Sequence, residues 1–180
     1  MDDNDYGSAR EQTRSQEDHC FGKYRGLVVD NEDPTSMGRL KVTAQGIFSD
    51  ISVWAMPCVP YAGDGVGFFT LPPVGSGVWV EFEAGDLSHP IWTGCFWGDG
   101  QIPGGDAVPA IKFLRTDKVT IRIDDEIGEL LIEVDGGSTI RITANEIEQE
   151  SAKILDRSSG KKTELTAAKF DVNGGALTVV

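Results

Sequence analysis

The chain has little positive charge, no long apolar run and almost no helical periodicity. It carries 16 basic against 29 acidic residues, a net charge of −13 over 180 residues. A protein that grips phosphate backbones needs a surplus of Lys and Arg, so this balance argues against nucleic acid as a partner. An anionic membrane surface would also repel the chain at rest. No run approaches the roughly 20 apolar residues of a membrane-spanning helix.

Cysteines are few, and the first residues lack an export signal. Cys20, Cys58 and Cys95 are odd in number and far apart, which favours reduced thiols. The first twenty residues are acidic and polar, without the apolar segment of a signal peptide. We therefore expect synthesis in the cytoplasm, without use of the general secretory route.

Short β runs separated by turns fill residues 24–100. In the stretch 71–97, apolar and polar residues alternate, Gly85 and Asp86 interrupt the pattern, and a second apolar run follows. This pattern predicts an antiparallel hairpin. Weaker runs lie at 26–29, 38–43 and 51–59. Five or six short strands with little helical periodicity favour a small closed or partly closed barrel, because closure removes exposed strand edges.

Polar or flexible segments flank this barrel. Residues 1–23 form a polar lead-in with few apolar anchors. Its Asp2, Asp3 and Asp5 lack the closing bidentate Glu of a calcium loop, so a solvated tail is the simpler interpretation. Residues 101–118 are rich in Gly and Pro and are expected to be a connector, extended through Ile111-Lys112-Phe113-Leu114.

Residues 119–180 alternate apolar and polar side chains but contain few bulky ones. Strands with one thin apolar face cannot bury enough surface within a single chain. Three copies around a common axis would share one core, with Val, Ile and Leu inward and Thr, Arg and Glu outward. We therefore predict a trimeric β-helix over 119–180. Its core residues would be Val119, Ile121, Ile123, Leu130, Ile132, Val134, Ile140, Ile142, Phe170 and Val172.

The residue types that carry chemistry do not form a known site. His19 and His89 lie far apart, and Ser88 beside His89 has no nucleophile elbow and no partner acid that the sequence identifies. Gly63, Gly65 and Gly67 lack the Lys and the helix of a phosphate loop, which favours a flexible loop. We expect no catalytic residue, no metal ligand and no cofactor.

Paired carboxylates leave an enzymatic alternative open. Polysaccharide-cleaving β-helices use two carboxylates on one face, and residues two apart in a strand share a face. A solvated outer strand face is the simpler explanation of such pairs. The candidate pairs are Glu81 with Glu83, Asp124 with Asp125, and Glu148 with Glu150.

An ordered set of short motifs between Tyr24 and Gly98 resembles the spike and hub proteins of contractile injection machines. These include phage baseplate assembly V-type proteins, type VI secretion spikes of the VgrG type and the spikes of extracellular phage-tail-like particles. The end of the chain, 170–177, also resembles the family's short-spike members. The motifs are Val29-Asp30-Asn31-Glu32-Asp33-Pro34, Gly38-Arg39-Leu40-Lys41-Val42, Ser52-Val53-Trp54-Ala55, Pro60, Ala62-Gly63, Leu71-Pro72, Gly75, Val78-Trp79-Val80, Phe82, Gly85-Asp86, Pro90 and Gly94.

The resemblance implies a fold and a function. The fold is an oligonucleotide/oligosaccharide-binding (OB) type barrel over 24–100, followed by an intertwined trimeric β-helix, a triple-stranded prism. The function is that of a homotrimeric needle in the baseplate of a phage tail or tail-like particle, driven through a target envelope when the sheath contracts.

The resemblance also implies partners. Baseplate, hub and tube proteins would bind the OB barrel, the target membrane would be met only transiently, and a small PAAR-like tip protein would cap Ala176, Leu177, Thr178, Val179 and Val180. Two alternatives stay open at this point: a β-helical enzyme acting on envelope polysaccharide, and an OB-type module that binds nucleic acid or sugar through its aromatic hairpin.

Overall fold

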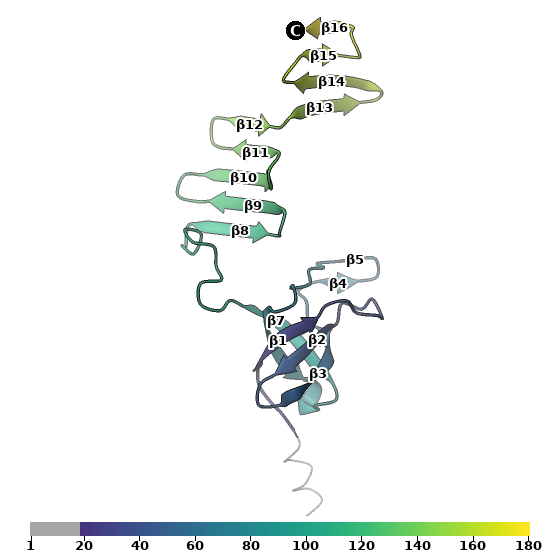
Figure 1. Cartoon of the computed structure of the whole chain (residues 1–180), viewed down its shortest axis with the longest axis vertical. Coiled ribbons are helices and arrows are strands. Elements are labelled where there is room, and N and C mark those ends of the chain that lie inside the picture. Colours follow the sequence, from purple (N-terminus) through teal and green to yellow (C-terminus); the bar gives the residue numbers. More distant parts are fainter. Residues whose placement is uncertain (1–18) are drawn as a thin grey trace, which may run out of the picture. The chain divides into compact units, whose positions relative to one another are not determined.

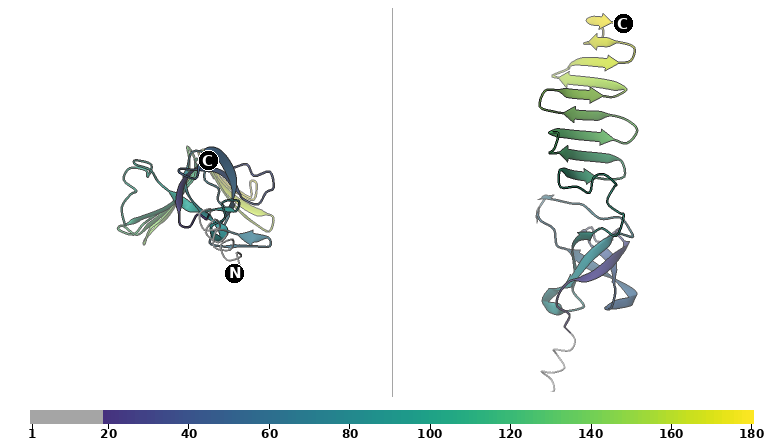
Figure 2. Two further views of the ribbon diagram at one scale, coloured as in Figure 1. Left: turned by 90° about the horizontal axis from the view of Figure 1, so that it is seen from below. Right: turned by 90° about the vertical axis from the view of Figure 1, so that its left-hand side faces the viewer.

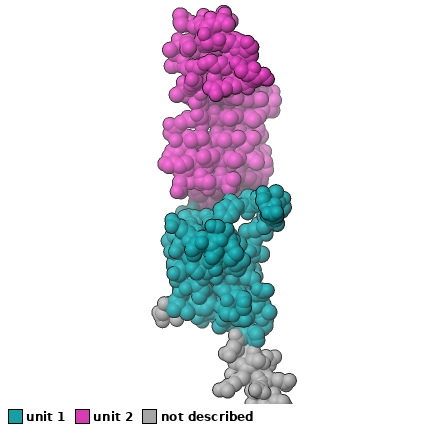
Figure 3. Space-filling view, turned by 90° about the vertical axis from the view of Figure 1, so that its right-hand side faces the viewer, with its two compact units in different colours: residues 1–101 teal, residues 102–180 magenta. Residues whose placement is uncertain are grey.

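The computed structural model describes residues 19–180, except for the side chains of residues 49 and 50. The chain divides into two compact units between Gln101 and Ile102, shown in two colours in Figure 3. Asp2, Asp3 and Asp5 and most of the expected lead-in lie outside the described residues. The end of that lead-in is held on the barrel unit, because Cys20 N donates a hydrogen bond to Gly85 O at 2.8 Å.

Unit 1 is built on a closed five-stranded barrel. Its strands are β1 (Tyr24–Asp30), β2 (Leu40–Ala44), β3 (Phe48–Pro57), β6 (Gly77–Phe82) and β7 (Pro90–Phe96), in the order β1-β2-β3-β7-β6 (Figure 1). Antiparallel pairing of β1 with β6 closes the barrel. The hairpin predicted from the alternation over 71–97 is confirmed as β6 and β7, with Val80 opposite Trp92.

Alternating apolar residues of these strands fill the barrel interior. Val28, Leu40, Val42, Val78 and Val80 are the largest fully buried side chains. At one point the wall needs a glycine, because a Cβ on Gly26 would lie 2.6 Å from Thr43 O of the neighbouring strand. The close approach of β1 to β2 at this point therefore requires a residue without a side chain.

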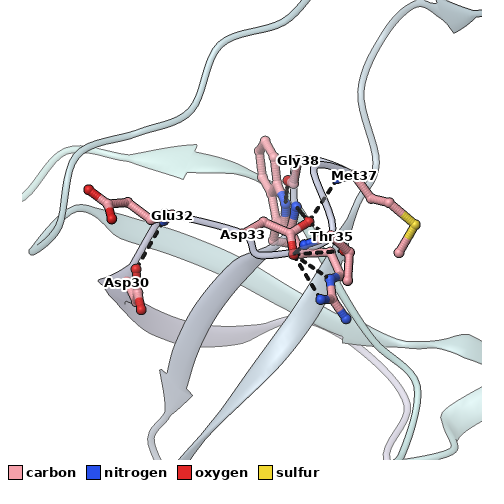
Figure 4. Close-up of polar contacts among 8 residues, drawn as sticks. Asp30, Glu32, Asp33, Thr35, Met37 and Gly38 are labelled. Carbon is pink, nitrogen blue, oxygen red and sulfur yellow. Dashed lines mark hydrogen bonds and ion pairs between the residues drawn. The ribbon is translucent and has the colours of Figure 1, made fainter.

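The turn between β1 and β2 is organised by one carboxylate (Figure 4). The side chain of Asp33 is 3% exposed and accepts hydrogen bonds from the backbone and side chain of both Thr35 and Arg39 and from Met37 N. The Arg39 guanidinium lies 2.8 Å from Asp33 Oδ1, and its hydrogen bond holds the pKa of that carboxyl far below the usual range. Beside this turn, Trp92 Nε1 donates to Gly38 O at 3.3 Å.

A small hairpin projects between β3 and β6. Among the strands of the described part of the chain, β4 (Ala62–Gly63) and β5 (Val66–Gly67) pair only with each other. Phe68 N donates to Tyr61 O at 2.9 Å. The sequence predicted a flexible loop here. That prediction missed the pairing, because strands of two residues are too short to show a period. We call residues 60–70, all exposed, the arm.

The first sheet of unit 2 has five strands in an antiparallel meander. They are β8 (Ile111–Arg115), β9 (Val119–Asp124), β10 (Glu129–Val134), β11 (Thr139–Ile142) and β12 (Ile147–Glu150), hydrogen-bonded in sequence order. β8 lies inside the expected connector, 101–118. It is a full strand of the sheet because all five of its residues pair with β9.

The second sheet of unit 2 continues the meander with four strands. They are β13 (Lys153–Ser158), β14 (Lys161–Thr166), β15 (Phe170–Val172) and β16 (Leu177–Val179). The strands of both sheets lie one above another in the right-hand view of Figure 2. The only helix among the described residues is the three-residue 3-10 turn η1 (Glu83–Gly85), so no described helix could cross a membrane.

Candidate functional site

One face of the first sheet of unit 2 is a ladder of aliphatic side chains. Strand register places Ile121 opposite Ile132, and Ile132 opposite Ile140. The neighbouring rungs are Ile123–Leu130–Ile142 and Val119–Val134. Although they are apolar, Val119, Ile121, Ile123, Val134 and Ile140 remain exposed in the single chain. We call this surface the aliphatic face.

The opposite face of the same sheet carries charge networks. Arg122 bonds Asp106 and Asp124 at 3.2 Å each, and Arg115 bonds Asp106 at 2.9 Å. Arg141 contacts Glu148 at 2.6 Å and Glu146 at 3.4 Å. The sheet therefore has one apolar and one polar face, which is the pattern of a sheet that covers something apolar on one side.

Electrostatics within these networks favours the ionised forms. Burial alone would raise the pKa of Asp106, but hydrogen bonds from Arg122 and Arg115 outweigh it and the pKa is lowered. The hydrogen bond to Glu148 raises the pKa of Arg141. These charges are mutually neutralised, which suits a structural face better than a reactive one.

The second sheet repeats the two-faced pattern. Ile154, Leu165, Phe170 and Val179 stand in register across its four strands. On the other face, Asp171 is 4% exposed and accepts hydrogen bonds from Gly174 N at 2.8 Å and Thr178 Oγ1 at 3.3 Å. Burial opposes ionisation of Asp171, but these donors and Lys169 lower its pKa overall.

Two comparisons with protein families identify these units. Residues 24–97 match the type VI secretion system/phage-baseplate injector OB domain. Residues 111–178 match the phage baseplate V C-terminal trimerisation domain. Together the two matches cover most of the chain. The chain belongs to the V-type, VgrG-like baseplate spike proteins. No curated protein matches it closely enough to be compared.

The family membership settles the coarse character of the spike protein. It is a homotrimer and a component of a phage or type VI injection baseplate. Its fold is an OB-like barrel followed by a β-rich trimerisation domain, as the sequence predicted. Both families are structural baseplate domains, so the spike protein is not an enzyme.

All ten residues predicted for the trimer core lie on apolar sheet faces. Eight belong to the aliphatic face, and Phe170 and Val172 lie on the corresponding face of the second sheet. Their burial against other copies stays a prediction.

The five residues predicted to meet a tip protein lie at the last strand. Val180 is 99% exposed, and Leu177 and Val179 of β16 are also exposed. In register, Leu177 lies opposite Val172 and Val179 opposite Phe170, so both share the apolar face of the second sheet. The outer edge of β16 has no strand beside it among residues 19–180. The tip contact also stays a prediction.

A Ser, a His and an Asp do meet in the loop after η1, but not as a catalytic triad. Ser88 Oγ lies 3.0 Å from His89 Nδ1, and Asp86 Oδ2 lies 3.1 Å from the same nitrogen. A triad needs the serine on one ring nitrogen and the acid on the other. Here Ser88 instead donates to Asp86 at 2.7 Å, and its hydrogen bonds lower the pKa of Asp86 to about 2. The sequence identified no acidic partner for Ser88 and His89, and the structure shows that Asp86 contacts both.

The carboxylate pairs that motivated the polysaccharide-enzyme alternative are engaged in separate contacts. Glu81 lies in β6 and pairs with Lys23 at 2.5 Å, whereas Glu83 lies in η1. Asp124 pairs with Arg122, Asp125 with Lys112, and Glu148 with Arg141. No group of His, Cys, Asp and Glu suited to a metal ion occurs in the described part of the chain.

The aromatic residues of the barrel hairpin are largely occupied by the spike protein itself. Trp92 is in the core. The Arg25 guanidinium lies 5.0 Å from the Trp79 ring centre and 4.7 Å from the Phe96 ring centre. Arg25 therefore lies over both rings. Trp97, directly after β7, is 63% exposed, so within this stretch it offers the most open aromatic surface for stacking.

Proposed function

We propose that this chain is the central spike of a contractile injection apparatus: a homotrimeric needle that pierces the target envelope when the sheath contracts. The observation that carries the proposal is the aliphatic face, which is in register across the three strands β9, β10 and β11 and largely exposed in the single chain. A trimer would turn it into a continuous dry core, and a dry core with backbone hydrogen bonds along every layer suits a shaft that must resist axial load.

The polar outer face supports transient passage through a membrane. Paired charges such as Arg122 with Asp124 and Arg141 with Glu148 would face outward if the aliphatic face is inward. Lipid chains offer no stabilisation to such a surface, so a spike of this kind would cross a bilayer under force without residing there.

A small tip protein would cap the end of the second sheet. The exposed edge of β16 and the apolar side chains of Leu177, Val179 and Val180 provide backbone groups and apolar area for it. Substituting Leu177 and Val179 by Asp should then remove the tip protein from purified particles. Thr178→Ser, which keeps the hydroxyl that bonds Asp171, is the matched control.

The barrel would hold the spike in the baseplate through the arm. The arm contains Tyr61, Val66, Phe68 and Phe69, the last 74% exposed, and its one charged residue is Asp64. It overhangs an open, mainly apolar cavity of about 250 Å³ that also contacts Met37 and Trp92. Protein interface cores are rich in aromatic residues and poor in charge, and a two-stranded hairpin is unstable alone. A hub or tube protein is the proposed occupant.

Particles assembled with altered spikes test the needle function. Ile132→Asp places a carboxylate on the aliphatic face, and Leu131→Asp places one on the polar face of the same strand. Because Ile132→Asp should abolish the spike trimer, its preparations should contain no particles that permeabilise target cells to a small dye, whereas Leu131→Asp particles should behave as wild type. Counting extended and contracted particles by electron microscopy separates an assembly defect from a piercing defect.

Permeabilisation at the wild-type level by assembled Ile132→Asp particles would contradict the proposal. A charged shaft would then be as effective as a dry one.

A further inference from the structure

Two strand edges in the middle of unit 2 have no partner strand among residues 19–180. β12 is the last strand of the first sheet and β13 the first strand of the second, and Ser151 and Ala152 alone separate them. All other consecutive strands from β8 to β16 pair with each other. All four residues of β12 are exposed. An open strand edge is a template for pairing with another chain.

The direction of the chain explains why these two strands do not pair with each other. β12 and β13 point the same way in Figure 1, so the chain runs on instead of folding back. Around a threefold axis, a strand that runs on enters the next face of the prism. There it lies one layer beyond the neighbouring copy's β12, and symmetry makes the two strands parallel.

We propose that each chain crosses at Ser151–Ala152 from one face of the trimeric prism to the next. There its β13 pairs in parallel with the free edge of the neighbouring copy's β12. We call this crossing the hand-over. Each copy's two sheets then belong to two different faces of the prism. The inference rests on the aliphatic face pointing inward, as in the proposed function.

The apolar pattern sets the register of this pairing. Ile147, 69% exposed, extends the aliphatic face onto β12, and Ile154 begins the apolar face of β13. Both must face the shared core, so the two strands can only align with their apolar residues on one side. An offset of seven residues places Ile147 beside the neighbour's Ile154 and Glu148 beside its Leu155.

The same offset matches the polar residues of the two edges. Gln149 is the polar residue of β12 on the apolar side, and Asp156 stands on the corresponding side of β13. Asp156 Oδ2 already accepts a hydrogen bond from Thr163 Oγ1 at 3.0 Å, so its second oxygen is available for the amide of Gln149.

On the outer side, the offset aligns opposite charges. Glu150 comes beside the neighbour's Arg157, and neither forms an ion pair with a residue of the described part of its own chain. Opposite charges on adjacent strands stabilise the pair modestly. Apolar, amide–carboxylate and ionic partners thus all coincide in one register.

Engineered disulfides in the full chain test the hand-over. With Cys20, Cys58 and Cys95 replaced by Ser, Glu148→Cys is combined with Leu155→Cys. Neighbouring strands lie about 4.8 Å apart, within the Cα separation that a disulfide spans. After mild oxidation and boiling in detergent, the covalent trimer should become the main band and should revert to monomer on reduction. Glu150→Cys with Arg157→Cys is the second pair.

A within-chain pair provides the matched control. Arg141 and Glu148 are partners in β11 and β12, so Arg141→Cys with Glu148→Cys should give only an internally bridged monomer. If this control forms its bridge while both test pairs give monomer, dimer or no bridge, the hand-over is wrong. Light scattering on the same samples before boiling shows whether they are trimers. A native trimer whose chains are bridged only internally would contradict this inference alone. A native monomer would contradict the proposed function as well.

Discussion

Ile132→Asp is the sharpest probe of the aliphatic face. Ile132 lies at the centre of β10, opposite Ile121 on one side and Ile140 on the other, both 37% exposed in the single chain. Ile132 itself is half-buried. If three copies converge on one core, a single substitution introduces three carboxylates into it.

The expected loss of stability is comparable with the total stability of a typical domain. Full burial of an isoleucine is worth about 1.5–3 kcal/mol, so the smaller part of Ile132 that is still exposed contributes less than about 1 kcal/mol per copy. An unpaired carboxylate in a dry interior costs several kcal/mol more. Summed over three copies the loss is on the order of 10 kcal/mol or more, against about 5–15 kcal/mol for the total stability of a typical domain.

Oligomeric state and melting temperature report the outcome. Static light scattering should give a trimer for the wild type and a monomer for Ile132→Asp. The barrel should remain folded in the variant, because it is a separate unit with its own core. Circular dichroism melting should therefore lose one transition and keep the other.

Leu131→Asp is the control, one residue away in the same strand. Leu131 lies on the opposite face, between Arg122 and Arg141, whose guanidinium groups would stabilise a new carboxylate. This variant should stay trimeric, with a melting temperature within a few degrees of wild type. An Ile132→Asp protein that remained trimeric with unchanged melting would refute the inward assignment of this face.

Three further predictions concern the barrel and the division of the chain. Gly26→Ala should cost the barrel about 1–3 kcal/mol in urea unfolding, because its Cβ would meet Thr43 O at 2.6 Å; Gly104→Ala, with nothing within 4 Å, is its control. The barrel should lose stability as the pH falls below about 4, since unfolding returns the depressed pKa of Asp33 to its ordinary value and lets it take up a proton. Asp33→Asn should be less stable at pH 7 and vary less over that range; identical pH profiles would contradict this role. A protein lacking residues 102–180 should be a monomer in light scattering. If the truncated protein were a trimer, the main trimer contacts would lie in the barrel and not in unit 2.

The amino-acid sequence alone determined which side of each strand is apolar. Period-2 alternation predicted the β6–β7 hairpin and placed Ile121, Ile132 and Ile140 on one face, because side-chain direction in a strand follows from sequence spacing. The scarcity of bulky residues after Val119 was enough to predict that the apolar face must be shared. Trimerisation is an established property of the family matched there.

Tertiary structure decided which segments meet. The sequence spacing of Asp33 and Arg39 does not predict that one carboxylate organises the turn between β1 and β2. Likewise, the residues Gly63 and Val66 do not predict a hairpin. The segment 111–114 was predicted to be extended but was assigned to a connector, because Gly and Pro dominate its surroundings; its pairing with β9 was not predicted. The same holds for Ser151–Ala152, where the chain could have folded back but runs on. Alternation fixes the face of a side chain locally, whereas partner strands are chosen by chain direction and packing over long distances.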